Sequence, residues 1–390
     1  MHDRRSASST IDDLWSTALE ITPGEVHRFE RRTHTKGMTP RGERIFNIAS
    51  SIVIFLFALG WSWSIALARA TGAGHPASSA TGILTSALTD ADAPSMAYLT
   101  DAALDVVNPL KGESGKLKAR IGQPGEAIPG DTLPKGAVAT FSSGAKAESS
   151  AVLNTPKKTG IWSIAIAIGN AIKPVTDFSV ITLLPASEKK GGRIGLYYIG
   201  NWPTGRVTPK ADYTPPSGFI EVTPETQNTA LSEHFKLRDF FPHDQPNVWP
   251  KYIVIKMKLV DKLELVLEDL NAHGIRSDGV RVMSGFRTPQ YNAGGGDPRG
   301  RAALSRHMYG DASDIFIDND GNGSMDDLNH DGKVNINDAR VILAAVNRVE
   351  AAHPSLIGGC GVYAGTSAHG PFTHIDTRGY PARWIGTGDN

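Results

Sequence analysis

The longest run of hydrophobic positions lies near the N-terminus. Ile45–Ala68, IFNIASSIVIFLFALGWSWSIALA, holds 24 residues without a charged side chain, enough for a helix that crosses a bilayer. Six basic residues lie between Arg28 and Arg44, and none lies between Arg69 and Lys111. This asymmetry predicts a cytoplasmic tail over residues 1–44, one transmembrane anchor over 45–69 and an exported remainder.

A cleaved signal peptide is the alternative. Ala68 and Ala70 provide the small-residue pattern of a cleavage site. Because the apolar run and the tail before it are long for a signal peptide, we expect the anchor to stay uncleaved. Both interpretations place residues 71–390 outside the cytoplasm.

The hydrophobic pattern changes twice after the anchor. Residues 70–155 are rich in Ala, Gly, Ser, Thr and Pro and show weak periodicity, which predicts a flexible spacer. In residues 156–225, the apolar runs Phe178–Leu184 and Ile194–Ile199 flank a Lys-Lys-Gly-Gly turn, which predicts a β-hairpin in a small β module. GIWSIAIAIG, just before them, is too short to cross a membrane and predicts a buried strand or helix.

Residues 226–390 alternate between helical and strand patterns. Leu259, Leu263, Val266 and Leu270 recur at helical spacing, and Gly274 follows as a stop. Strands are predicted at VRVMSGF, ASDIFI and PFTHIDTRG, and a second helix at DARVILAAVNRVEAAHP. We therefore predict an α+β domain with a small antiparallel sheet and flanking helices.

Composition narrows the possible chemistry. The chain has 40 basic and 40 acidic residues, so no overall charge suggests a nucleic-acid partner. Its single cysteine, Cys360, excludes an internal disulfide and a cysteine-based zinc site, and its apolar surroundings predict a buried side chain. Any zinc ion must therefore be held by histidine and carboxylate ligands.

Such ligands occur in two sequence motifs that lie far apart in the chain. His307 and Asp314 lie in HMYGDASD, and His374 lies in FTHIDTRG. Two histidines and one carboxylate would leave a fourth position open for water, as in catalytic zinc sites. Asp314 also begins a short apolar strand, where a buried carboxylate needs a cation.

Three motifs give these residues a context. MSGFRTPQYN, SRHMYGDASDI and FTHIDTRG, in this order, resemble the M15 group of zinc peptidases, which includes D-Ala-D-Ala carboxypeptidases and peptidoglycan endopeptidases. The resemblance covers about residues 228–387, beginning near LSEHFKLRDF. It implies that His307, Asp314 and His374 bind Zn²⁺. The substrate-contacting residues that it implies are Arg287 and Ser305, with Gln290 and Tyr291 in the first motif.

The same resemblance implies a function and a location. We expect a zinc metallopeptidase that hydrolyses peptidoglycan stem or cross-link peptides through a zinc-activated water. The single anchor would hold it in a bacterial cytoplasmic membrane, with the C-terminal domain in the cell envelope.

The general base is left open by the sequence. Many members of the group have a Glu or His two or three residues before the last zinc histidine, where this chain has Pro371 and Phe372. Asp376 shares a strand face with His374 and is one candidate, although it could instead orient a ligand. His369 is the other. This departure keeps open a catalytically inactive, membrane-anchored peptidoglycan-binding protein.

Two overlapping acidic runs follow Ile317 and have the spacing of EF-hand-type calcium loops. The first offers Asp318, Asp320, Asn322, Ser324 and Asp326. The second resembles half of a dockerin repeat and offers Asp327, Asn329, Asp331, Lys333 through its carbonyl, Asn335 and Asp338. A dockerin needs two halves to bind its partner. We therefore expect structural Ca²⁺ in an insert over residues 318–338, as one or two ions, and no obligate protein partner.

Overall fold

The computed structural model describes residues 105–129, 135–203, 213–294 and 302–386, with Ser51, Thr100, Ala103 and Leu133 as isolated positions. The chain divides into two compact units, 1–91 and 92–390, and all described residues except Ser51 belong to the second. No helix among the described residues is long and apolar enough to cross a membrane. The predicted tail and anchor, Ser51 apart, lie outside these residues.

The second unit is a mixed α+β structure with several small sheets and few helices, as expected for its fold class. Its first sheet has five strands in the order β1-β5-β4-β2-β3. Their bounds are β1 Ala119–Gly122, β2 Ala137–Ser143, β3 Lys146–Ser150, β4 Gly160–Ile168 and β5 Ala171–Thr182. Trp162, Ile164 and Ile166 alternate on one face of β4 and are buried. The segment GIWSIAIAIG is therefore a strand, one of the two predicted alternatives.

The predicted spacer is wrong at residues 119–122, 137–143 and 146–150, which form β1, β2 and β3. In β2, Ala137, Ala139 and Phe141 do alternate towards the core. Alanine, serine and threonine dominate β2 and β3, however, so the hydrophobic contrast that marks a strand is weak there. The pairing of β2 with β4 and of β3 with β2 supplies the strand character that the local sequence does not show.

The predicted hairpin between Phe178–Leu184 and Ile194–Ile199 is also wrong. β5 pairs with β1 and β4, and the later run contributes to a separate two-stranded sheet. That sheet joins β7 (Arg193–Ile194) to β8 (Tyr197–Tyr198). Both strands that pair with β5 precede it in the sequence, so the polar turn after β5 does not set its pairing.

A three-stranded sheet follows the first sheet in the chain, and short 3₁₀ helices lie at several places along it. The sheet has the order β10-β9-β6, with bounds β6 Leu184–Pro185, β9 Gly218–Val222 and β10 Lys251–Ile253. The 3₁₀ helices are η2 Asn108–Leu110, η3 Ala186–Glu188, η4 Leu237–Phe240, η5 Arg306–Tyr309 and η6 Pro354–Leu356.

The C-terminal sheet has the order β11-β12-β14-β13-β15. Its strands are β11 Val280–Ser284, β12 Ala312–Ile317, β13 Gly359–Tyr363, β14 Phe372–Asp376 and β15 Ala382–Gly386. The three predicted strands are confirmed as β11, β12 and β14. The sheet is antiparallel as predicted except at one edge, where β13 and β15 run parallel.

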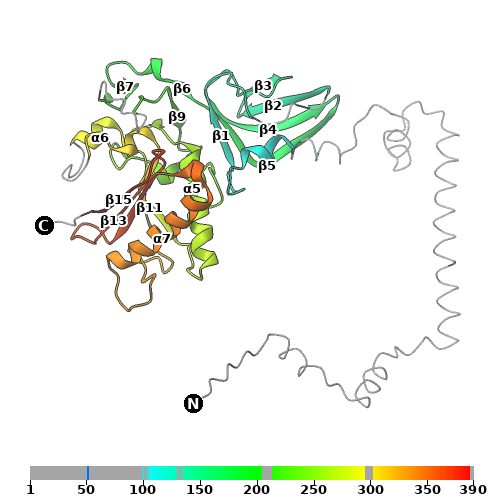
Figure 1. Cartoon of the computed structure of the whole chain (residues 1–390). Helices are drawn as coiled ribbons and strands as arrows, with labels where there is room; N and C mark the ends of the chain where they lie inside the picture. The colour runs from blue at the N-terminus through cyan, green and yellow to red at the C-terminus, as the bar shows by residue number, and fades with distance from the viewer. Residues whose placement is uncertain are drawn as a thin grey trace, which may run out of the picture. The chain divides into compact units, whose positions relative to one another are not determined.

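Two long helices accompany this sheet (Figure 1). They are α5 (Met257–Ala272) and α7 (Ile336–Ala352), and both confirm predicted helices, whereas α6 (Pro289–Gly294) is short. The Thr373 hydroxyl of β14 donates to the carbonyl of Ala339 in α7 at 3.1 Å. Ile315 and Ile375 share this face of the sheet and are fully buried, which leaves His374 and its neighbours on the opposite face.

A buried ion pair ties both helices to the end of β14. Lys262 of α5 is fully buried, and its Nζ donates to Glu350 Oε1 of α7 at 2.6 Å and to the carbonyl of Asp376 at 2.8 Å. Glu350 also accepts the Gly358 amide at 3.0 Å. The Lys262 side chain therefore connects the end of β14, the strand that carries His374, to α5 and α7.

Replacing Glu350 by leucine should destabilise the protein strongly. The change would leave the Lys262 ammonium buried without its counter-charge, at a cost of about 3–5 kcal/mol in free energy of unfolding. The double variant Lys262→Met/Glu350→Leu should lose less, because it removes both buried charges and leaves unpaired only the partly exposed guanidinium of Arg383, which also contacts Glu350. Urea unfolding of the three proteins measures this, and equal losses in the single and double variants would contradict it.

Candidate metal centre

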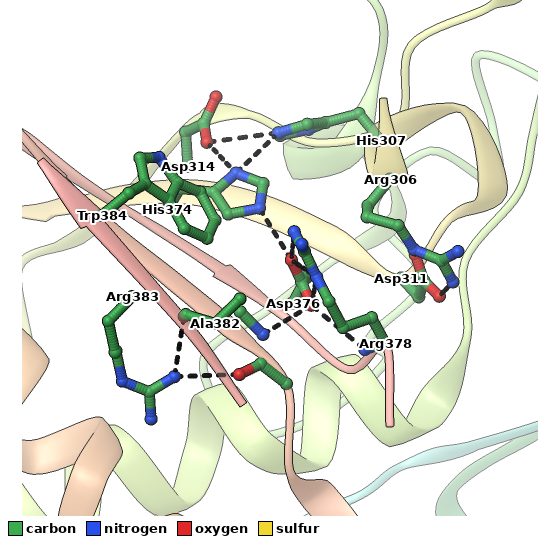
Figure 2. Close-up of polar contacts among 12 residues, drawn as sticks. Arg306, His307, Asp311, Asp314, His374, Asp376, Arg378, Ala382, Arg383 and Trp384 are labelled. Atoms are coloured by element: carbon green, nitrogen blue, oxygen red, sulfur yellow. Dashed lines mark hydrogen bonds and ion pairs between the residues drawn. The ribbon is translucent and has the colours of Figure 1, made fainter. Parts of the chain in front are cut away.

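Three side chains from separate segments converge on one face of the C-terminal sheet (Figure 2). Asp314 Oδ1 lies 2.8 Å from His374 Nδ1 and 3.2 Å from His307 Nε2. The two histidine nitrogens lie 3.1 Å apart. All three side chains are buried. The structure therefore brings together the residues predicted as zinc ligands.

Strand register and one glycine produce this convergence. Asp314 of β12 lies directly opposite His374 of β14 in the antiparallel pair. His307 belongs to η5, which ends at Gly310 with a φ of 70°. A Cβ at Gly310 would lie 2.5 Å from the carbonyl oxygen of Val254, so only glycine suits this close, left-handed turn into β12.

Partners on the far side of each ring fix the two histidine tautomers. His307 Nδ1 lies 2.7 Å from the carbonyl oxygen of Gly285, which can only accept, so Nδ1 must carry the hydrogen. His374 Nε2 similarly donates to Asp376 Oδ2 at 3.1 Å. In each neutral ring, the lone pair is left on the nitrogen that faces Asp314.

The three convergent atoms could hold one metal ion. A tetrahedral ion with bonds of 2.0–2.1 Å to nitrogen separates its ligand atoms by about 3.3 Å. The observed separations of 2.8–3.2 Å are close to this value. Three acceptor atoms at such distances repel one another unless a proton or a cation lies between them, so the donor set fits a metal.

Without a metal, these groups shift one another's protonation. Burial alone would lower the pKa of His374, but hydrogen bonds to Asp314 and Asp376 raise it to about 9. Burial lowers the pKa of His307, and the positive charge of Arg287 adds to that effect. Burial would raise the pKa of Asp314, but the two imidazoles and Arg287 hold it well below its usual range.

Arg287 contacts the ligand Asp314 directly. Its Nη2 donates to Asp314 Oδ2 at 2.7 Å, and its Nε donates to the Ser284 hydroxyl at 2.8 Å. Ser284 lies opposite Asp314 in the pair of β11 and β12. Arg287 therefore holds the second carboxylate oxygen and leaves Oδ1 for the centre. A contact of Arg287 with substrate, which the resemblance implies, stays a prediction.

Asp376 lies on the outer side of His374 and is saturated with donors. It accepts the amides of Gly359 at 2.7 Å and Arg378 at 3.0 Å, in addition to the imidazole of His374. The guanidinium of Arg378 donates to both of its oxygens (Figure 2). Burial would raise the pKa of Asp376, but His374 and Arg378 lower it far below its usual range.

The remaining predicted residues make other contacts. The Ser305 carbonyl accepts the Met308 amide at 3.1 Å, and the amides of Gln290 and Tyr291 donate to the Ile199 carbonyl and the Thr288 hydroxyl, each at 3.0 Å. His369 Nδ1 lies 2.9 Å from the carbonyl of Gly370, and its ring packs edge-on against Phe372. These contacts do not join the four residues to the three ligand atoms.

Sequence reasoning missed three partners of the centre: the carbonyl of Gly285, the guanidinium of Arg378 and the ring of Trp384. The Trp384 ring lies 5.2 Å from that of His374, and its Nε1 donates to the Tyr363 hydroxyl at 2.9 Å. Arg378 stands within FTHIDTRG and could have been noticed. The other two carry no pattern in the sequence, because their roles depend on pairing of distant strands.

Comparisons with known proteins find no match to the chain among protein-family models, curated proteins or solved structures.

We expect the binding of one zinc ion to the metal-free protein to release about one proton at pH 7. His374 is protonated below its pKa of about 9 and must lose a proton before Nδ1 can bind a cation, whereas His307 is already neutral. Zinc affinity should therefore fall as the pH is lowered from 9. Calorimetric titration in buffers of different ionisation enthalpy measures the protons released.

The variant His374→Ala serves as the control and should bind zinc weakly, without this proton release. Release of no proton by the unchanged protein between pH 6 and 8 would contradict the assignment.

Proposed function

We propose that the C-terminal domain is a zinc-dependent peptidase that hydrolyses peptidoglycan stem or cross-link peptides. One observation carries the proposal: His307 Nε2, Asp314 Oδ1 and His374 Nδ1 converge while every ligand is held from behind by another group. Pre-oriented ligands that leave a coordination position for water are typical of catalytic zinc.

The donor set favours zinc over harder ions. Two imidazoles and one carboxylate suit zinc, whereas calcium and magnesium prefer oxygen ligands alone. When bound, zinc supplies Lewis-acid chemistry, which lowers the pKa of water and polarises a peptide carbonyl.

The protein's own residues would orient the zinc ligands and enclose the site. Arg287 orients Asp314, and Asp376, itself held by Arg378, orients His374. Trp384 lies against His374 and covers one side of that ring. A residue larger than glycine at position 361 would meet the indole, since a Cβ there would lie 2.2 Å from it.

The substrate class rests on the resemblance of the three motifs to M15 peptidases. MSGFRTPQYN supplies Arg287, SRHMYGDASDI supplies two ligands and FTHIDTRG supplies the third together with Asp376. A single N-terminal anchor at residues 45–69 would keep this domain in the cell envelope, next to peptidoglycan. The anchor remains a prediction from hydropathy and charge.

We assign Asp376 to orientation and not to proton transfer. Its two oxygens already accept hydrogen bonds from two amides, one imidazole and one guanidinium. A carboxylate with so depressed a pKa holds a proton poorly. His369, whose loop leads into β14, is the remaining proton-transfer candidate from the sequence.

The variant Asp376→Asn distinguishes the two roles. An asparagine has one acceptor for four donors, so the tautomer of His374 would no longer be fixed. We expect zinc affinity to fall about 10- to 100-fold, with peptide hydrolysis recovered at saturating zinc. Zinc binding by equilibrium dialysis and hydrolysis at several zinc concentrations measure this. Full zinc occupancy without hydrolysis would instead identify Asp376 as the base.

The peptidase activity itself can be tested on the full-length, zinc-loaded protein with purified muropeptides. We expect peptide-bond cleavage, detected by mass spectrometry, which also shows the bond that is cut. Asp314→Asn removes the charged ligand and should lower the rate by at least about 100-fold. Asp278→Asn makes the same charge change at an exposed position and should leave the rate unchanged.

One observation favours a second function. Pro371 and Phe372, which precede His374, cannot carry a proton, and Asp376 is fully hydrogen-bonded. An inactive peptidoglycan-binding protein would keep the metal centre without turnover. Stoichiometric zinc and muropeptide binding without cleavage would support that function and reject the peptidase.

A further inference from the structure

An acidic insert begins where β12 ends. Asp318, Asp320 and Asp326 each offer a carboxylate oxygen, and these three oxygens lie within 4.8 Å of one another. Met325 and Leu328 are almost fully buried and join the main hydrophobic core. The insert is therefore packed onto the domain, and its carboxylates are held close together although their charges repel.

A buried carboxylate oxygen in this cluster has no donor. Asp318 is only 3% exposed; its Oδ2 accepts the Gly323 amide at 3.2 Å and faces Arg281 Nε at 3.4 Å. Its Oδ1 is buried, and no hydrogen-bond donor among the described residues reaches it. Leaving a buried charged oxygen unpaired is costly, so the position calls for a cation.

The neighbouring groups suit a large, hard cation. Gly323 adopts a φ of 86°, which gives the sharp turn needed at the sixth position of an EF-hand-type loop. The spacing also predicts Asn322 and Ser324 as ligands; Asn322 Nδ2 donates to Asp320 Oδ2, and its Oδ1 accepts the Ser324 amide, each at 2.8 Å. Calcium takes 6–8 oxygen ligands in flexible geometry, whereas magnesium demands a regular octahedron with short bonds.

In the second predicted calcium frame, backbone amides already donate to the carboxylates at the first and last positions. Asp338 is fully buried, and its oxygens accept the amides of Leu328, Asn329 and Asn335, the last as part of the cap that begins α7. Asp327 likewise accepts the amides of Asp331 and Gly332. Protein donors reach both carboxylates, as they also reach Asp320 and Asp326 of the first frame, so the argument for a cation rests on Asp318 Oδ1.

We propose that Asp318, Asp320 and Asp326 form a calcium site, and that this site stabilises the candidate metal centre. Two contacts connect them. Asp318 directly follows β12, which carries Asp314, and its amide donates to the Gly279 carbonyl at 2.9 Å beside β11. Ser324 lies against Gly370, where a Cβ would be 2.8 Å from its hydroxyl, and this segment leads into β14 and His374.

Calcium binding is tested on the full-length protein after all metals are removed, by titration with Ca²⁺ alone. We expect binding by calorimetry and a rise in melting temperature of several degrees, with much weaker binding of Mg²⁺. Asp318→Asn and Asp326→Asn should each weaken calcium binding at least about tenfold, because ligand charge sets affinity in such loops. The exposed control Asp278→Asn should bind as the unchanged protein does.

Circular dichroism of each calcium-free variant shows whether it has folded, and two variants guard against one that has not. Absence of calcium binding, or binding unaffected by both Asp318→Asn and Asp326→Asn, would overturn the site.

The link to the metal centre rests on the proposed zinc site and has its own measurement. Zinc affinity is determined with and without saturating calcium, and we expect calcium to tighten zinc binding. The Gly370→Ala variant should reduce this effect, because the added methyl group displaces Ser324. Unchanged zinc affinity would overturn the link but leave the calcium site standing, and an absence of zinc binding would reject the proposed peptidase centre instead.

Discussion

The antiparallel pairing of β12 with β14 is the constraint on which the candidate centre depends. It sets Asp314 opposite His374 on one face, while Ile315 and Ile375 are buried on the other. A slip of β14 by one residue would turn His374 towards the helices and place Thr373 or Ile375 opposite Asp314. The hydrophobic core therefore fixes the register, and the register brings the carboxylate to the imidazole.

Each carboxylate on this face is paired with a guanidinium before any ion binds. Asp314 is paired with Arg287, and Asp376 is paired with Arg378. A divalent ion between the ligands would therefore leave the centre positively charged in a buried site, where charges interact more strongly than in water. Such a centre favours anionic groups, which agrees with the proposed hydrolysis of peptides whose ends and side chains carry carboxylates.

The sequence predicted the three convergent residues but not the arrangement that orients them. His307, Asp314 and His374 were identifiable because their spacing falls in motifs, and period-two alternation correctly placed Asp376 on the face of His374. The strand pattern could not show which imidazole nitrogen of His374 would contact Asp376. The Gly285 carbonyl is a backbone group that any residue could supply, so no side-chain pattern marks it. The strands β1–β3 were missed because their small residues gain strand character from pairing, β1 with β5, β2 with β4 and β3 with β2.

The position of the acidic insert follows from the same strand. Asp314 lies within β12 and faces the candidate metal centre. β12 ends at Ile317, and Asp318, four residues after Asp314, begins the loop. Met325 and Leu328 bury this loop in the core, which brings its carboxylates together against their repulsion. The apolar contacts of Met325 and Leu328 hold the loop on the domain, and the repulsion between its carboxylates opposes this packing. A cation at Asp318 would remove that opposition and so strengthen the anchoring of β12, the element that the two sites share.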